Sequence, residues 1–219
     1  REAIDIYDAV IKFELTANRP DCRSIIGIAR EAAVTIGKKT KYPQIEVKEC
    51  DEEIDFDVKV ENPELCMRYG ARIIKDVKIG PSPYWMQRKL IEAGMRPISN
   101  IVDITNYVML ELGQPLHAFD LDDIKYNKMT VKMAEEGEKF TTLDGVERTL
   151  TSDMLVIGNQ DKTLDLAGIM GGENSEIKDT TTSIFIEGAS FAKENIRATS
   201  KKLGLRTEAS SRFEKGIDI

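Results

Sequence analysis

The sequence predicts an α+β fold with mixed, largely antiparallel sheets, flanking helices and one main domain behind a short N-terminal fragment. Many strand-like runs are mixed with only a few helical patterns, without the regular strand–helix–strand alternation of a doubly wound sheet. Short polar turns separate two pairs of these runs, as in hairpins. The chain of 219 residues is 41% hydrophobic and 32% charged, which suits a globular protein that folds without disulfides.

Composition narrows the classes of function. Cys22, Cys50 and Cys66 lie far apart without metal-binding spacing, so we expect no metal site and a reducing, cytoplasmic environment. No apolar run approaches a membrane span or a signal sequence, so no membrane partner is expected. The net charge of −7 argues against a protein whose main role is to grip nucleic acid.

The N-terminal part has its own pattern. Residues 9–15 alternate like a strand, and a turn at residues 18–21 leads into a helix that places four apolar residues on one packing face before Gly37 ends it. We therefore predict a strand–helix fragment at residues 1–40, a polar linker at 41–53 and the main domain at 54–219. Because the chain begins with Arg1, we expect it to be part of a longer polypeptide. The predicted helix face consists of Ile25, Ile28, Ala32 and Ile36.

In the main domain, β-branched runs predict strands, and glycine, proline and polar residues predict where elements begin and end. Ser82 is the expected N-cap of a helix that continues to Gly94, and Asp144-Gly145 is the expected hairpin turn. The other helices are expected at 100–112 and 194–203. Strands are expected at residues 56–60, 69–79, 130–133, 139–150, 155–157, 163–169 and 183–189.

The helix from Asn100 precedes the only histidine of the chain. Asn100 is the expected cap, and Gly113 followed by Pro115 ends the helix, so His117 should stand in a fixed loop. There it could change charge near pH 7. The expected apolar stripe of this helix is Ile101, Ile104, Val108 and Leu112.

Two further segments carry candidate chemistry. Gly168, Gly171 and Gly172 mark a bend where backbone can approach a ligand, although a simple tight turn explains them as well. Glu187 interrupts the apolar strand at 183–189, so it is either exposed to solvent or buried with a partner. The residues alone leave both alternatives open.

Residues 193–215 carry seven basic and three acidic residues, a local charge of +4. A solvated helix face is the simpler explanation, and a nucleic-acid contact is the other. Lys201, Lys202 and Arg206 are the candidate contacts with nucleic acid.

Four long motifs resemble the beta subunits of bacterial phenylalanyl-tRNA synthetases, in the part that clears mischarged tRNA. They lie at residues 100–120 (NIVDITNYVMLELGQPLHAFD), 15–30 (LTANRPDCRSIIGIAR), 167–177 (AGIMGGENSEI) and 205–215 (LRTEASSRFEK). The resemblance covers essentially the whole chain. It also implies that residues 1–40 are one half of a neighbouring module that is interrupted in sequence.

This resemblance implies an editing domain that hydrolyses tyrosyl-tRNA carrying the phenylalanine anticodon. It implies that His117, Thr105 and Asn106 act on the ester, while a substrate pocket is formed by Glu187, Pro115, Gly171 and Ala209. Among these, we expect His117, Thr105 and Glu187 to line one pocket with Gly171 on its wall.

The resemblance further implies the tRNA acceptor end and its tyrosine moiety as partners, and an alpha subunit within a heterotetramer. No cofactor is expected in this chain, since ATP and magnesium should bind only at the synthetic site of the alpha subunit. The rival interpretation is a non-catalytic segment that joins modules and contacts the alpha subunit and tRNA.

Overall fold

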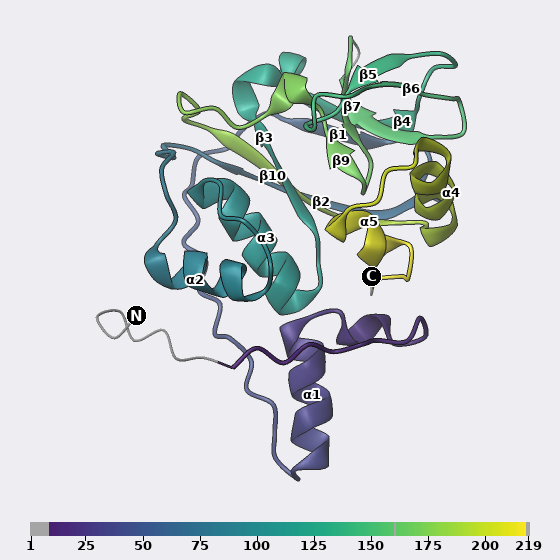
Figure 1. Ribbon diagram of the computed structural model, residues 1–219. Helices are drawn as coiled ribbons and strands as arrows, with labels where there is room; N and C mark the ends of the chain where they lie inside the picture. The colour runs from purple at the N-terminus through teal and green to yellow at the C-terminus, as the bar shows by residue number, and fades with distance from the viewer. Residues whose placement is uncertain (1–8, 160, 218–219) are drawn as a thin grey trace.

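The structure, a computed structural model, describes residues 9–159 and 161–217. The predicted fold class is confirmed, because this part of the chain contains five α-helices and three mostly antiparallel sheets (Figure 1). The largest sheet is mixed, since β1 (Asp57–Val60) and β4 (Lys128–Met133) pair in parallel. None of the helices in the described ranges has the length and apolar character needed to cross a membrane.

The five-stranded sheet holds the strands predicted at residues 56–60, 130–133, 155–157 and 163–169. The expected hairpin at residues 155–169 is confirmed as the antiparallel pair β7 and β8, although Gln160 in its turn lies outside the described residues. The hairpin at Asp144-Gly145 is also confirmed, with Gly145 at a φ of 74° between β5 (Lys139–Thr141) and β6 (Glu147–Thr149). The five strands in spatial order are β1 (Asp57–Val60), β4 (Lys128–Met133), β7 (Leu155–Gly158), β8 (Thr163–Leu166) and β9 (Met170–Gly171).

A second sheet places β10 (Ile184–Phe191) between β2 (Cys66–Ile74) and β3 (Leu116–Asp120). Side chains alternate between its two faces. One face, which includes Phe119 and Phe185, joins the main core with the five-stranded sheet. The opposite face carries Ala118 and Ile184, which pack with Ile101 of α3.

Helix α3 (Asn100–Leu112) covers that opposite face, and α2 (Tyr84–Glu92) packs beside α3 (Figure 1). Both helices were predicted, but Ser82 does not cap α2. Its hydroxyl donates to the buried carboxylate of Asp103 in α3, so it links the two helices instead.

The predicted apolar stripe of α3 is shifted around the helix. Ile101 is buried, whereas Ile104 and Leu112 are 40% and 39% exposed. Thr105 and Met109 are buried with Ile101, so the packed face follows positions i, i+4 and i+8 from Ile101. The spacing of apolar residues in the sequence therefore predicted the wrong buried face of α3.

At the other end of the domain, α4 (Lys193–Leu203) ends at Gly204 as predicted, with a φ of 61°. A short helix that was not predicted follows it, α5 (Glu208–Phe213). Thr207 and Ser210 form a capping box at its start, and Phe213 packs on Phe191 of β10 with ring centroids 5.1 Å apart.

The N-terminal part differs most from the prediction. Residues 9–15 form no strand, which leaves only α1 (Ile25–Thr35) and a short 3-10 turn at Pro20–Cys22. The expected packing face of α1 is largely exposed, with Ile25 at 65% and Ile36 at 63%. Residues 38–56 form neither helix nor strand. The predicted strand and packed helix face are thus wrong, whereas the domain boundaries stay a prediction.

Candidate functional site

His117 lies in a strand and not in the predicted loop. Gly113 ends α3 in the left-handed region at a φ of 86°, Pro115 follows, and β3 then pairs antiparallel with β10. The side-chain amide of Gln114 fastens this junction by donating to the carbonyls of Pro115 and Ala189. In the resulting register His117 stands directly opposite Glu187, so both side chains point to the same face of the sheet.

A second pair of residues faces this one from the five-stranded sheet. Asp165 of β8 stands opposite Gly171 of β9. A Cβ atom added at Gly171 would lie 2.6 Å from Nε2 of His117 and closer still to Cε1, a separation that atoms in proteins do not tolerate. Only glycine therefore lets β9 approach the imidazole this closely.

The two pairs enclose a small cavity of about 50 Å³. It is large enough for a few water molecules, at roughly 10–15 Å³ for each. Pockets for drug-sized ligands usually measure about 300–1,000 Å³, so a larger ligand requires the cavity to widen. The lining residues are Pro115, Leu116, His117, Asp165, Gly168, Ile169, Met170, Gly171, Glu187, Ala209 and Phe213.

Only one of the two carboxyl oxygens of Glu187 has a hydrogen-bond partner among the described residues. Glu187 is 4% exposed, and its Oε2 accepts a hydrogen bond of 2.7 Å from the hydroxyl of Tyr69 on β2. No donor among the described residues reaches Oε1. Oε1 therefore remains an acceptor that a ligand in the cavity could use.

Burial also raises the pKa of both carboxyl groups in the cavity. The pKa of Asp165 rises to about 7 because the side chain is desolvated. The pKa of Glu187 lies well above its ordinary value, mainly through burial and further through the charge of Asp165, against the hydrogen bond from Tyr69. The cavity therefore retains at least one carboxylic proton at neutral pH.

Burial lowers the pKa of His117 to about 4. The prediction that this residue changes charge near pH 7 is therefore wrong, and the imidazole is neutral there. Its ring packs edge-on against Phe119 with centroids 4.5 Å apart. Neither ring nitrogen has a hydrogen-bond partner in the described part of the chain. A neutral imidazole held in this way can accept a proton from water.

Thr105 and Asn106 do not line this cavity with the other predicted residues. Thr105 lies on the face of α3 that also carries Ile101, which packs on the side of the sheet opposite to His117 and Glu187. Its hydroxyl donates to the carbonyl of Val102, one turn earlier. The expectation that Thr105 shares one pocket with His117 and Glu187 is thus wrong for this structure.

Pro115 and Ala209 lie on the wall of the cavity. The basic candidates lie elsewhere and are partly neutralised. Lys202 pairs with Asp153 at 3.0 Å, and Arg206 pairs with Glu214 at 3.3 Å. Lys201 is exposed and has no ion pair within the described residues.

A basic cleft of about 450 Å³ adjoins the cavity. Residues that are neighbours in sequence line the two sites. Gln114 and Arg212 line the cleft, and the next residues, Pro115 and Phe213, line the cavity. Four basic side chains and one carboxylate line the cleft. Within the described ranges, Arg23 and Arg30 have no carboxylate partner, and Arg30 instead contacts the hydroxyl and ring of Tyr42.

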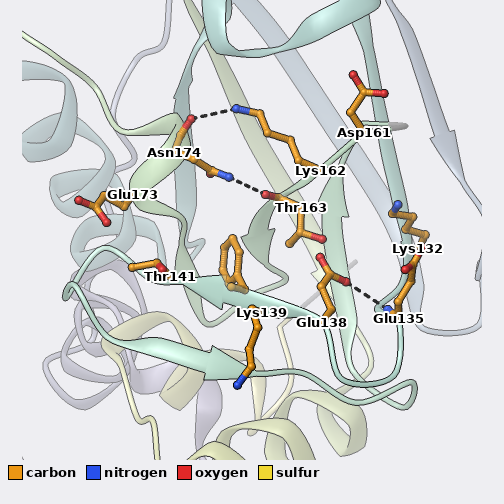
Figure 2. Close-up of a pocket in the computed structure, with 11 residues that line it drawn as sticks. Lys132, Glu135, Glu138, Lys139, Thr141, Asp161, Lys162, Thr163, Glu173 and Asn174 are labelled. Atoms are coloured by element: carbon orange, nitrogen blue, oxygen red, sulfur yellow. Dashed lines mark hydrogen bonds between the residues drawn. The ribbon is translucent and has the colours of Figure 1, made fainter.

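A larger pocket of about 560 Å³ opens between the ends of β4, β5 and β8 (Figure 2). Lysine and acidic side chains alternate around it, and several are already bound: Lys162 donates to the carbonyl of Asn174, and Glu138 accepts from the amide of Glu135. It contains none of the residues predicted for the site. Its charges are mixed and its rim is open, and the buried hydroxyl of Thr163 in its wall has no hydrogen-bond partner among the described residues.

One acidic cluster has the residue types of a metal site. Asp21, Cys22 and Glu31 bring their ligand atoms within 4.8 Å of one another. The guanidinium group of Arg19 contacts all three, at 2.7 Å from Asp21, 3.1 Å from Cys22 and 2.6 Å from Glu31. The cluster therefore binds an arginine side chain of the same chain.

Comparison with known proteins agrees with this arrangement. The model of the B3/4 domain family matches residues 65–219, which include every residue that lines the small cavity. The chain belongs to the B3/4 domain family. The resemblance to bacterial phenylalanyl-tRNA synthetase beta subunits is confirmed as well. Over 218 residues the chain is 50% identical to the phenylalanine–tRNA ligase beta subunit of Carboxydothermus hydrogenoformans, and over 220 residues it is 54% identical to that of Clostridium tetani.

These matches cover 100% of the chain but only 27% and 28% of the two relatives. The B3/4 domain and its flanking segment thus correspond to about a quarter of such a subunit. A crystal structure of an N-terminal fragment of the beta subunit from Pyrococcus horikoshii overlaps 86% of this chain and 59% of that one, with 19% identity and a TM-score of 0.46. That likeness is too distant to bear on the fold.

Two residues of the site were missed from the sequence. Asp165 interrupts the apolar strand of β8 as Glu187 interrupts β10, so the same signal could have found it. Tyr69 carries no such signal, because a tyrosine is ordinary in a strand. Its role depends on the register that places β2 beside β10.

Proposed function

We propose that this B3/4 domain hydrolyses the ester of tyrosine that has been mischarged onto tRNA with the phenylalanine anticodon. The small cavity supports this best, because His117 and Glu187 line it together beside Gly171, and the ring nitrogens of His117 and Oε1 of Glu187 have no hydrogen-bond partner among the described residues. Such atoms cluster at functional sites. In the reaction water attacks the ester carbonyl, the bond between that carbon and the ribose oxygen breaks, and tyrosine and tRNA are released.

A second site is needed because a synthetic pocket shaped for phenylalanine cannot strongly exclude tyrosine. An apolar pocket rejects an added hydroxyl by only about a hundredfold. A site that hydrogen-bonds the hydroxyl reverses the selection, since phenylalanine would leave its buried polar groups unpaired, which can be worth roughly 10⁴ in discrimination. Glu187 suits this role, with Oε1 as the atom that meets the hydroxyl.

His117 is proposed to act on the attacking water, which it orients or deprotonates. The imidazole is neutral at pH 7 and can accept a hydrogen bond from that water, while its lowered pKa of about 4 makes it a weak base, which favours orienting the water over deprotonating it. Pro115 and Ala209 form the walls around the substrate ring. Thr105 and Asn106 do not line this cavity, so we propose no contact of theirs with the ester.

The proposed partners follow from the same function. The tRNA acceptor end brings the ester to the cavity, and the alpha subunit of a cytoplasmic heterotetrameric enzyme carries out aminoacylation. We propose that ATP and magnesium bind only there, since ester hydrolysis by positioned water requires neither.

One observation favours a second candidate, a non-catalytic segment that contacts other parts of the enzyme. The N-terminal part exposes several apolar side chains, among them Val10 at 68% and Ile11 at 73%, whereas the cavity measures only about 50 Å³. Exposed apolar clusters of this kind are typical of interaction surfaces. This candidate does not explain the unpartnered polar atoms in the cavity.

Deacylation by the intact two-subunit enzyme distinguishes the two candidates. The wild-type enzyme should release tyrosine from tyrosyl-tRNA, and His117→Ala should slow this release by about 10²–10⁴, the usual contribution of a general base. Aminoacylation with phenylalanine should continue in the variant, as a control for folding and assembly. Equal release by both enzymes would favour the non-catalytic segment.

A further inference from the structure

Asp165 is a second carboxyl group in the cavity. It is 3% exposed and lines the cavity from β8, across from the pair formed by His117 and Glu187. Within the described residues, the only hydrogen bond to its side chain comes from the backbone of Leu166. A buried carboxyl group with so little support from the protein costs stability, so it calls for a ligand that satisfies it.

The proposed substrate has a group that needs two partners. A phenolic hydroxyl donates one hydrogen bond and also accepts one. A single carboxylate only accepts, so Glu187 alone would leave the phenolic oxygen without a donor in a buried place. Two neighbouring carboxyl groups that share one proton offer both an acceptor and a donor.

We propose that Asp165 and Glu187 bind the ring hydroxyl as a pair, one accepting its proton while the other donates to its oxygen. This inference rests on the proposed function and assigns Asp165 as a specificity-determining residue for it. Tyr69 is the positioning residue of the pair, because its hydroxyl occupies Oε2 of Glu187 and leaves Oε1 for the ligand. Phenylalanine offers the pair nothing and leaves both groups unpaired.

The protonation of the cavity supports the pair. The raised pKa of Glu187, together with a pKa of about 7 for Asp165, leaves one shared proton just above neutral pH. The other titratable groups near the pair do not lose or gain a proton near pH 7. The pKa of His117 is lowered to about 4, that of Cys66 is raised to about 12, and that of Tyr69 lies well above its ordinary value. The ends of α5 add only Ala209 and Phe213 to the cavity wall.

The test compares tyrosyl-tRNA with phenylalanyl-tRNA as substrates of the intact two-subunit enzyme. Asp165→Leu should slow tyrosine release by roughly ten- to a hundredfold, the cost of leaving one buried hydroxyl contact unmade. It should raise the slow release of phenylalanine, because it removes one of the two groups that this ring leaves unpaired. Asp165→Asn keeps a donor and an acceptor and should retain most of the tyrosine rate. Asp120→Asn is the matched control, since Asp120 is 5% exposed but bonds to Thr181 outside the cavity.

The pH profile provides a readout that a purely structural role would not move. In the wild-type enzyme the preference for tyrosine should rise as the pH passes about 7, because a charge-assisted hydrogen bond forms when the pair loses its first proton. In Asp165→Asn this step should disappear.

Three outcomes overturn the inference. Unchanged selectivity in Asp165→Leu would mean that Asp165 does not contact the ring hydroxyl. An equal reduction in rate for both substrates would mean that the side chain only supports packing. A step near pH 7 that persists in Asp165→Asn would assign the titration to another group. A wild-type enzyme that releases no tyrosine would instead overturn the proposed function itself.

Discussion

Glu187 combines a buried position with an oxygen that the protein does not use, and this contrast predicts its contribution to binding. Replacing it with alanine should reduce the affinity for free tyrosine to that for phenylalanine, a loss of about 1–3 kcal/mol for one buried hydrogen bond. Calorimetry with both amino acids measures this difference. Glu194→Ala, an exposed residue of α4, is the control and should change neither affinity. A preference that survives in Glu187→Ala would show that another residue reads the hydroxyl.

His117 allows a direct check of the electrostatics, because it is the only histidine of the 219 residues. Its imidazole resonance should stay constant from pH 8 to about 5 in an NMR titration and move only near its pKa of about 4. Titration close to 6.5, the ordinary value for histidine, would contradict the burial described here.

The lowered pKa of His117 also affects stability. Between about 6.5 and about 4 the unfolded chain binds a proton at this residue that the folded chain does not. This residue therefore contributes stability that is complete above pH 6.5 and is lost as the pH falls toward 4. The contribution should be absent from the unfolding free energy of His117→Phe, so the difference between the two proteins should change across this pH range.

Among single residues, the sequence predicted those with an unusual chemical type and missed those whose role depends on a neighbour. His117, Glu187 and Gly171 were candidates because each interrupts a pattern, and they line one cavity in the structure. Tyr69 could not be found in this way, since it matters only through the hydroxyl that it directs at Glu187.

At the scale of elements, the approach of β9 to β3 shapes the cavity and depends on Gly171. Gly171→Ala should push the His117 ring out of place, because a Cβ atom would overlap it. Tyrosine release should fall at least tenfold, about 1.4 kcal/mol in the barrier, while the fold is retained. Gly80→Ala serves as control, since a Cβ atom there meets nothing within 4 Å. Equal rates in the two variants would show that the close approach has no role in the reaction.

The elements that the sequence predicted well are those fixed by local chemistry. Gly113 and Gly204 end their helices as expected, and the Asp144-Gly145 turn joins its two strands. The strand at His117 was missed because β3 is only 5 residues long. A run this short shows no clear pattern, and it becomes a strand by pairing with β10. The strand predicted at residues 9–15 had an alternating pattern but has no partner strand within the described residues.

At the scale of the whole molecule, the distribution of charge predicts how tRNA approaches. Arg23 and Arg30 lie in the cleft beside the cavity without carboxylate partners among the described residues, whereas Lys202 is paired with Asp153. We therefore expect the double variant Arg23→Ala/Arg30→Ala to weaken tRNA binding. The salt dependence should also fall, by about one unit of slope for each phosphate that the variant no longer neutralises. Binding of the intact enzyme to tRNA over a range of salt concentrations measures this slope.

Two comparison variants make this prediction specific. Lys201→Ala/Lys202→Ala should reduce the salt-dependence slope less than Arg23→Ala/Arg30→Ala does. A larger reduction would mean that tRNA binds along residues 193–215, as the sequence predicted. Ala209→Trp should leave the slope unchanged and block tyrosine, because the larger side chain fills the cavity wall. An altered slope in Ala209→Trp would mean that the cavity and the tRNA path are not separate.

The central claim is that the small cavity binds the tyrosine side chain, and a crystal structure of the domain with tyrosine tests it most directly. The cavity should widen, and the ring hydroxyl should lie within hydrogen-bond distance of Glu187 and beside Asp165, with His117 near the carboxyl end of the ligand. Tyrosine found instead in the larger pocket around Lys132 and Lys162, with the small cavity still closed, would contradict the account.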